Sequence, residues 1–83
     1  MEAFDEGTEL FSQPRRRGEK IIVKWMLYKD YPYIDLRLWT ESPNGKWHPS
    51  AKGFTLPPDQ LLIFGTRLVD AARSLQRDEG VTR

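Results

Sequence analysis

Two neighbouring segments of this chain alternate between apolar and other side chains with a period of two residues, and this pattern requires a fold built on a β-sheet. In residues 20–28 the apolar row comprises Ile21, Val23, Trp25 and Leu27. In residues 33–41 one row comprises Ile34, Leu36 and Leu38, and the other comprises Tyr33, Asp35, Arg37 and Trp39. We therefore expect two strands whose apolar rows, Trp25 included, belong to the core, joined by a turn at residues 29–32.

The remainder of the chain predicts two further strands and one helix. Asn44-Gly45 is a strong signal for a hairpin turn because both residues tolerate positive φ. Short strands are expected at residues 46–48 and 53–56. Pro58 then suits the first turn of a helix, where its missing N–H costs nothing. The apolar stripe of this helix comprises Leu61, Phe64, Leu68, Ala72 and Leu75. The apolar surface is wider than one sheet contact needs, so we expect the helix also to contact a second subunit.

The order of these elements predicts an α+β fold in a single domain. It is a four-stranded antiparallel sheet followed by one C-terminal helix (ββββα). We expect a flexible, acidic-then-basic tail at residues 1–17, the folded domain at residues 18–77 and a frayed C-terminus at residues 78–83. With one helix, only one face of the sheet is covered, and the other is open to water or a ligand.

The charges are unevenly distributed along the chain. Residues 1–14 carry four acids and no base, whereas residues 15–83 carry all 13 bases and the other eight acids. The acidic leader is either a solvated tail, an interaction arm or a competitor for the basic groups of the domain. The Arg15–Arg17 triplet is either a phosphate-contacting arm or a solvated charge run.

Several classes of function find no support in the residues. The chain has no cysteine, and His48 is its single histidine, so neither a metal site nor a cofactor is expected. No Ser-His pair, Gly-rich phosphate loop or paired carboxylate set indicates an enzyme. No apolar run approaches 18 residues, and the acidic start is unlike a secretion signal. We expect an intracellular protein, in the cytoplasm or nucleoid if bacterial or phage and in the nucleus if eukaryotic.

Cations and aromatic rings are mixed on the predicted β-structure, a composition that is typical of surfaces that hold single-stranded nucleic acid. The candidate binding residues are Lys24, Tyr28, Lys29, Tyr31, Arg37, Trp39, Lys46, Trp47, His48 and Lys52. Alternatives remain for some of them. Trp39 and Trp47 are equally suited to a dimer interface, and Tyr28 and Tyr31 to capping a hairpin. Asp35 would repel phosphate, so an ion pair with Arg37 or a neighbouring lysine is its expected role.

The chain resembles the positive cofactor 4 family of transcriptional coactivators from about Gly18 to Leu75. The positions that carry the resemblance are Ile34-Asp35-Leu36-Arg37, Pro43, Gly45, Pro49, Lys52-Gly53, Leu56, Pro58 and Gln60. The resemblance implies a ββββα domain with a curved sheet that forms a homodimer through its helix and sheet, and it implies that grooves on the curved sheets hold unpaired DNA strands. It also implies that Tyr28 stacks on a base and that Lys29, Arg37 and Lys52 are basic ligand contacts.

Four positions depart from the family pattern. The second-strand tryptophan stands one position early, as Trp39, and Thr40 takes its place. A lysine is replaced by His48, an arginine by Ala51, and a basic loop residue by Tyr31. These departures predict a less charged and more aromatic groove.

These observations together predict a homodimeric single-stranded DNA-binding protein with little sequence preference. It would serve as a transcription cofactor, or act at melted DNA in transcription, replication or repair. The expected partners are single-stranded DNA, a second copy of the chain and transcription or replication proteins, with no membrane. Two alternatives stay open: a protein-interaction module of the transcription machinery, and an RNA-binding protein.

Overall fold

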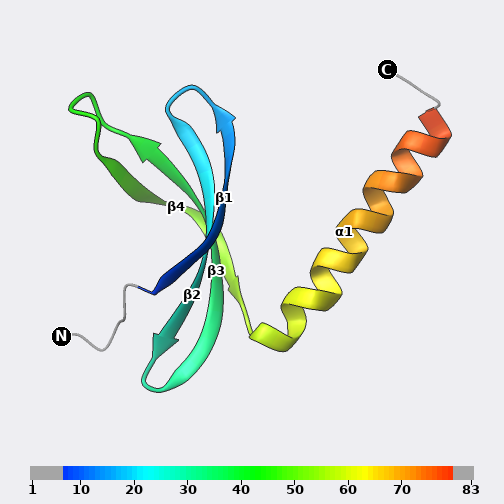
Figure 1. Cartoon of the computed structure of the whole chain (residues 1–83), viewed down its shortest axis with the longest axis horizontal. Coiled ribbons are helices and arrows are strands. Elements are labelled where there is room, and N and C mark those ends of the chain that lie inside the picture. Colours follow the sequence, from blue (N-terminus) through cyan, green and yellow to red (C-terminus); the bar gives the residue numbers. More distant parts are fainter. Residues whose placement is uncertain (1–6, 80–83) are drawn as a thin grey trace.

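The chain forms a four-stranded antiparallel sheet followed by one helix, as the sequence predicts (Figure 1). The computed structural model describes residues 7–79, with side chains as far as residue 77. The elements are β1 (Thr8–Arg16), β2 (Glu19–Tyr28), β3 (Tyr31–Glu41), β4 (Trp47–Leu56) and α1 (Pro58–Glu79). Strands that follow one another in the chain also pair in the sheet, so the topology is a meander. No helix within residues 7–79 combines the length and apolar character that crossing a membrane requires.

The first strand corrects the prediction of a flexible tail over residues 1–17. Residues 8–16 form β1 and pair antiparallel with β2, whereas residues 1–6 lie outside the described part of the chain. Gly18, with φ at 76°, completes the turn that reverses the chain. Every residue of β1 is exposed. Because neither face of this strand is buried, its sequence shows no alternation of apolar and polar residues from which a strand could be predicted. Pro14 is tolerated because β1 is an edge strand.

The short strands predicted at residues 46–48 and 53–56 are parts of a single strand, β4. Pairing with β3 continues through both parts, and residues 50–52 of β4 stand opposite Leu38 of β3 alone. The sequence signal was divided because the extra residues form a bulge, which breaks the alternation of a strand without ending it.

The bulge in β4 keeps its polar groups paired. The hydroxyl of Ser50 donates to the carbonyl oxygen of Leu38 at 2.8 Å and accepts from the backbone N–H of Lys52 at 3.1 Å. Gly53 follows where the two backbones approach closely. A Cβ at this position would lie 2.5 Å from the carbonyl oxygen of Leu36, so a side chain has no room here.

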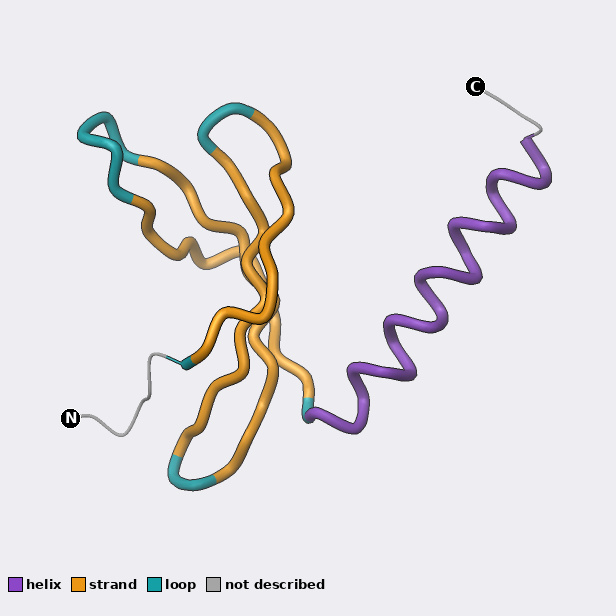
Figure 2. The backbone as a smooth tube through the Cα atoms, in the orientation of Figure 1, coloured by secondary structure: helices purple, strands orange, loops and turns teal. Residues whose placement is uncertain are grey.

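The two predicted apolar rows of β2 and β3 share one face of the sheet, which we call the helix face. The register pairs Ile21 with Leu38, Val23 with Leu36, and Trp25 with Ile34. α1 approaches this face near its start, where the rings of Phe54 and Phe64 meet edge to face with centroids 5.8 Å apart. Beyond that contact α1 runs away from the sheet (Figures 1 and 2). It extends to Glu79, past the predicted boundary at residue 77, and residues 80–83 lie outside the described part.

The buried core of the single chain is small. Its buried apolar side chains, among the described residues, are Ile22, Val23, Met26 and Ile34. Ile22 and Met26 belong to the row opposite the helix face, so that side of the sheet is partly closed as well. Trp25, which was expected in the core, is 36% exposed. That expectation is wrong for the single chain, because α1 leaves the sheet before it can cover this ring.

Candidate nucleic-acid interface

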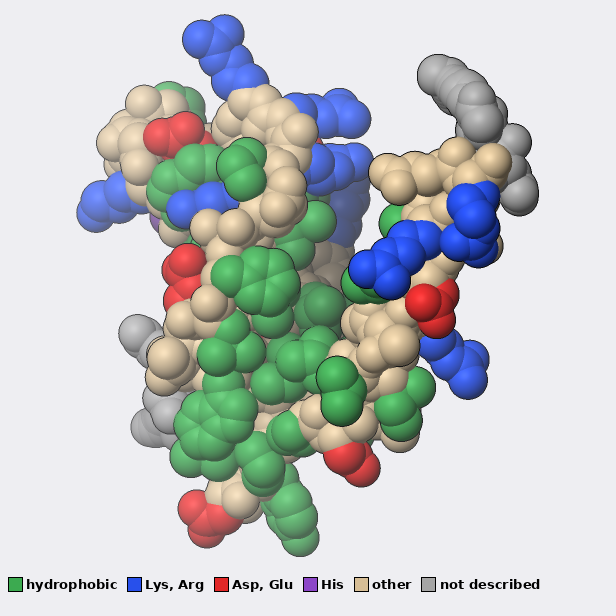
Figure 3. All heavy atoms as spheres, turned by 45° about the vertical axis from the view of Figure 1, so that its right-hand side comes forward, with side chains coloured by type: hydrophobic (Ala, Val, Ile, Leu, Met, Phe, Trp, Pro, Cys, Tyr) green, Lys and Arg blue, Asp and Glu red, His purple; other side chains and the backbone are tan. Residues whose placement is uncertain are grey.

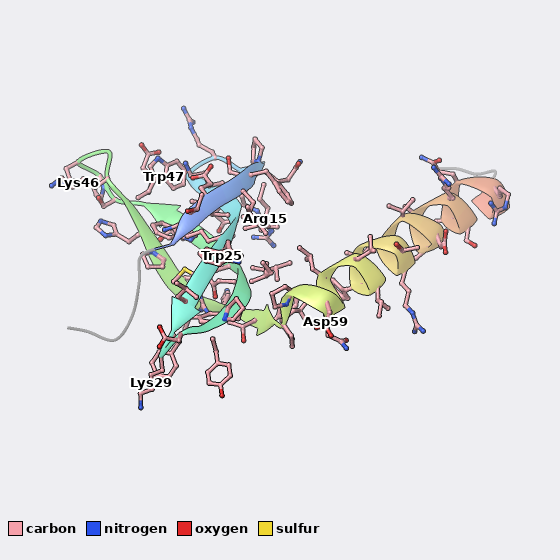
Figure 4. All side chains as sticks on the ribbon, turned by 60° about the horizontal axis from the view of Figure 1, so that its bottom comes forward. Arg15, Trp25, Lys29, Lys46, Trp47 and Asp59 are labelled. Atoms are coloured by element: carbon pink, nitrogen blue, oxygen red, sulfur yellow. The ribbon has the colours of Figure 1, made fainter. Side chains whose placement is uncertain are left out.

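The face of the sheet opposite the helix face carries most of the predicted cations and rings, and we call it the open face. The antiparallel register brings a row from β2 beside the row from β3. The open face comprises Lys20, Lys24 and Tyr28 of β2, Tyr33, Asp35, Arg37 and Trp39 of β3, and Trp47 of β4. In Figure 4, Lys29 and Trp47 lie at opposite ends of the sheet. The predicted ligand row of β3 therefore has lysines beside it along its length.

Two hollows on the open face meet at Asp35 and Arg37, which line both. The first has a volume of about 590 Å³, and its other lining residues are Lys24, Met26, Trp39, Pro49 and Ser50. The second has a volume of about 480 Å³, and its other lining residues are Tyr28, Tyr31, Pro32, Tyr33 and Thr55. Tyr31 is 75% exposed at the end of the β2–β3 hairpin, opposite Tyr28. A ligand that follows β3 would cross both hollows, each lined in part by aromatic rings, and would pass over Asp35 and Arg37 between them.

Arg37 is held by Asp35, as the sequence analysis expected for that carboxylate. Nη2 of Arg37 donates to Oδ1 of Asp35 at 2.9 Å, and Nε donates to Oδ2 at 3.1 Å. Nη1 donates to the carbonyl oxygen of Ser50 at 3.0 Å. Asp35 is only 8% exposed. The positive charge of Arg37 is thus already balanced within the chain, so Arg37 adds less net charge to the face than an unpaired arginine would.

The carboxylate of Asp35 contributes to the raised pKa values of two neighbouring side chains, Arg37 and Tyr33. Its hydrogen bond raises the pKa of the Arg37 guanidinium above the ordinary value, so this side chain stays charged. Burial, followed by the charge of Asp35, raises the pKa of the Tyr33 phenol. Tyr33 therefore presents a neutral hydroxyl to the second hollow at physiological pH.

Three lysines each lie over an aromatic ring of this region. Nζ of Lys20 lies 4.3 Å from the ring centroid of Trp47, and Nζ of Lys24 lies 4.9 Å from that of Trp39. Nζ of Lys29 lies 5.5 Å from the ring centroid of Tyr28. All three distances are within the range of cation–π attraction. Lys20 on β2 thus reaches over β3 to a ring on β4. The structure thus joins a cation to a ring at three points along the face.

Sequence reasoning missed Lys20. The signal was present, because Lys20 and Lys24 are four residues apart in a predicted strand and must share a face. The missing information was the position of Trp47, which only the path of β4 supplies.

The indole Nε1 of Trp39 is a buried donor without a hydrogen-bond partner among the described residues.

Three of the predicted binding residues lie away from the centre of the open face. Lys52 lines a hollow on the helix face together with Arg15 and Phe64. His48 is opposite Thr40, in a row that belongs to the helix face. Lys46 projects from the β3–β4 turn at the edge of the sheet (Figure 4). Ordinary alternation along β4 accounts for His48 and Lys52, because Pro49 and Gly53 stand opposite Trp39 and Arg37 of the open face and the neighbours of these residues point the other way.

Comparison with known proteins places the chain in a family. The sequence model of the family described as Transcriptional Coactivator p15 (PC4) matches residues 16–64. This chain belongs to the PC4 family. The matched segment covers β2, β3, β4 and the start of α1, and it includes every predicted binding residue from Lys24 to Lys52.

A solved structure shows the same fold as this PC4-family chain. It is the protein described as "Bacteriophage T5 Homolog of the Eukaryotic Transcription Coactivator PC4 Implicated in Recombination-Dependent DNA Replication". The TM-score is 0.62 at 19% sequence identity, and the similarity covers 90% of each chain. At this identity the likeness concerns the fold alone. No curated protein matches the chain.

Proposed function

We propose that this PC4-family protein binds single-stranded DNA with little sequence preference. Its role would be that of a transcription cofactor, or of a protein acting at melted DNA in transcription, replication or repair. The observation that carries the proposal is the series of three lysine–ring pairs along the sheet. Lysines neutralise phosphates and rings stack on bases, at about 1–3 kcal/mol for each stacked base. Membership of the PC4 family supports DNA as the ligand.

The arrangement favours unpaired strands over duplex. Rings that lie on the surface of a sheet can stack only on bases whose faces are exposed, and in a duplex those faces are covered by neighbouring base pairs. Little sequence preference follows because stacking and phosphate contacts do not distinguish the bases. The buried carboxylate of the open face, Asp35, is engaged by Arg37, so it is poorly placed to select a base edge.

We also infer that two copies associate through α1 and the helix face. Leu62, Leu68 and Leu75 are 77%, 54% and 68% exposed on α1. Of the five predicted interface residues, Leu61 and Phe64 are partly covered, whereas Leu68, Ala72 and Leu75 are exposed. Figure 3 shows apolar side chains gathered over the sheet beside α1. A long amphipathic helix gains most of its stability from packing its apolar face, and a second copy offers a matching apolar surface.

The experiment that tests the proposed ligand is fluorescence anisotropy with labelled oligo-dT, a matched duplex and RNA across a salt series. We expect the tightest binding to oligo-dT, weakening with salt. Four engaged phosphates would give a slope of about −3 when the logarithm of the binding constant is plotted against the logarithm of the salt concentration, for single strands. Tighter binding to duplex, or an affinity that salt does not change, would contradict the proposal. Tighter binding to RNA would instead support the RNA-binding alternative.

A further inference from the structure

The rings that are expected to stack on bases are covered by lysines of the same chain. Nζ of Lys24 lies 4.9 Å from the ring centroid of Trp39, and Nζ of Lys20 lies 4.3 Å from that of Trp47. A cation held over an aromatic ring occupies the face that a stacking base would use. A base can therefore reach this face of either indole only after the lysine has moved.

We propose that Lys20 and Lys24 are movable caps that make the open face selective for bases joined by charged phosphodiesters. This inference rests on the proposed single-strand function. A phosphate beside an incoming base offers the ammonium a better partner than the ring, because the contact joins two full charges and adds a charge-assisted hydrogen bond. The lysine then transfers from ring to phosphate, and the base takes its place. When the neighbouring backbone group is uncharged, the lysine loses its contact with the ring and gains no contact with a phosphate. The base must then displace the lysine at the full cost of that lost contact.

The positions of the caps suit a ligand that runs along β2. Lys20, Lys24 and Tyr28 follow one another at four-residue intervals on the same face. At about 3.3 Å per residue, each interval is about 13 Å long. Lys20 and Trp47 thus form a further subsite at the β1–β2 end of the open face, about 26 Å along β2 from Tyr28. The single strand would extend along the whole of β2, to the end of the open face where Lys20 stands opposite Trp39 and covers Trp47.

The test compares two oligomers of equal length, oligo-dT with native phosphodiesters and oligo-dT with an uncharged methylphosphonate backbone. They are titrated against the parent protein, Lys24→Ala and Lys20→Ala. Lys46→Ala is the matched control, because Lys46 is a lysine of the same region that covers none of the described rings. Circular dichroism checks the fold of each variant, and acrylamide quenching of tryptophan fluorescence in the free protein reports exposure of the indoles.

For each cap variant we expect weaker binding of the native oligomer but tighter binding of the uncharged one, by about two- to five-fold. Acrylamide quenching should rise in the same variants. Lys46→Ala should weaken native binding and leave the uncharged oligomer and the quenching unchanged. Lys24→Arg, which keeps a cation over the ring, should bind the uncharged oligomer no better than the parent does.

Two different failures can be told apart. If the parent does not bind native oligo-dT, the proposed function itself is wrong. If the parent binds native oligo-dT but the folded cap variants bind the uncharged oligomer no more tightly than the parent, the caps are structural contacts and the inference is overturned.

Discussion

Arg37 and Asp35, two residues apart on β3, form a bidentate ion pair whose shortest contact is 2.9 Å, between Nη2 and Oδ1. The guanidinium also donates to the carbonyl oxygen of Ser50 in the β4 bulge, at 3.0 Å. One side chain thus neutralises a buried carboxylate and ties β3 to the irregular part of β4. Arg37 therefore contributes directly to the fold, apart from the contact with a ligand that we propose for it.

We predict that Arg37→Ala destabilises the protein by about 2–3 kcal/mol, because it leaves the charge of Asp35 buried and unpaired. The side chains are 24% and 11% exposed, so we place the loss below that of a fully buried pair. Urea denaturation measures it. The double variant Arg37→Ala with Asp35→Asn should recover part of the loss. If the double variant is as unstable as the sum of the two single variants, the residues are not coupled.

Gly53 and Gly65 should respond oppositely to alanine. A Cβ on Gly53 would lie 2.5 Å from the carbonyl oxygen of Leu36 and 2.8 Å from Cα of Arg37, so Gly53→Ala should cost about 1–3 kcal/mol. A Cβ on Gly65, within α1, meets nothing within 4 Å, so Gly65→Ala should gain about 1 kcal/mol through helix propensity. Thermal and urea unfolding of both variants compare them. A Gly53→Ala protein as stable as the parent would mean that β3 and β4 separate easily here.

Stability should fall in alkaline solution partly through Tyr33. Burial raises the pKa of its phenol above the ordinary value of 10.0, so the unfolded chain loses this proton at a lower pH than the folded one. The stabilising effect is complete below pH 10 and disappears as pH rises through the folded pKa. Urea midpoints at pH 8 and above pH 10 should therefore differ less for Tyr33→Phe than for the parent. Tyr31→Phe, at the exposed hairpin end, is the control and should retain the parent's difference.

Ring and cation variants should change DNA binding in distinguishable ways. Trp47→Ala should cost about 1–3 kcal/mol of oligo-dT binding by loss of stacking, with the salt slope unchanged. Lys46→Ala should make the slope shallower by about 0.7, the value for one phosphate on a single strand. Anisotropy titrations at four salt concentrations separate the two effects. A changed slope for Trp47→Ala would show that this ring does not act by stacking.

Association of two copies should depend on the apolar stripe of α1. Leu75 is 68% exposed, and Leu75→Glu would place a charge in the inferred interface, where it would lose its hydration. Sedimentation velocity should show the parent as two chains and this variant shifted toward one. Arg73→Glu, which changes a charge on the same helix away from the stripe, should leave the parent's state intact. A parent that sediments as a single chain would disprove the dimer.

Local sequence patterns were sufficient for the elements that carry an apolar row or stripe at a regular spacing. Alternation placed β2 and β3, and Pro58 with the apolar stripe placed α1. β1 was not predicted, because it is exposed on both faces and its sequence has no periodic pattern of apolar residues. β4 was divided because three of its residues stand opposite Leu38, and a bulge cannot be distinguished from a loop by spacing alone.

For the candidate site, strand periodicity was sufficient to predict which side chains β2 and β3 place on one face, because a strand alternates with a period of two. The sequence also predicted an ion pair for Asp35, because a free carboxylate on a face that binds nucleic acid would repel phosphate. The contact between Lys20 and Trp47 became apparent only in the folded chain, since it joins β2 to β4 across the strand between them. The register of β4 against β3 likewise places His48 opposite Thr40 on the helix face, and Lys52 lines the hollow on that face.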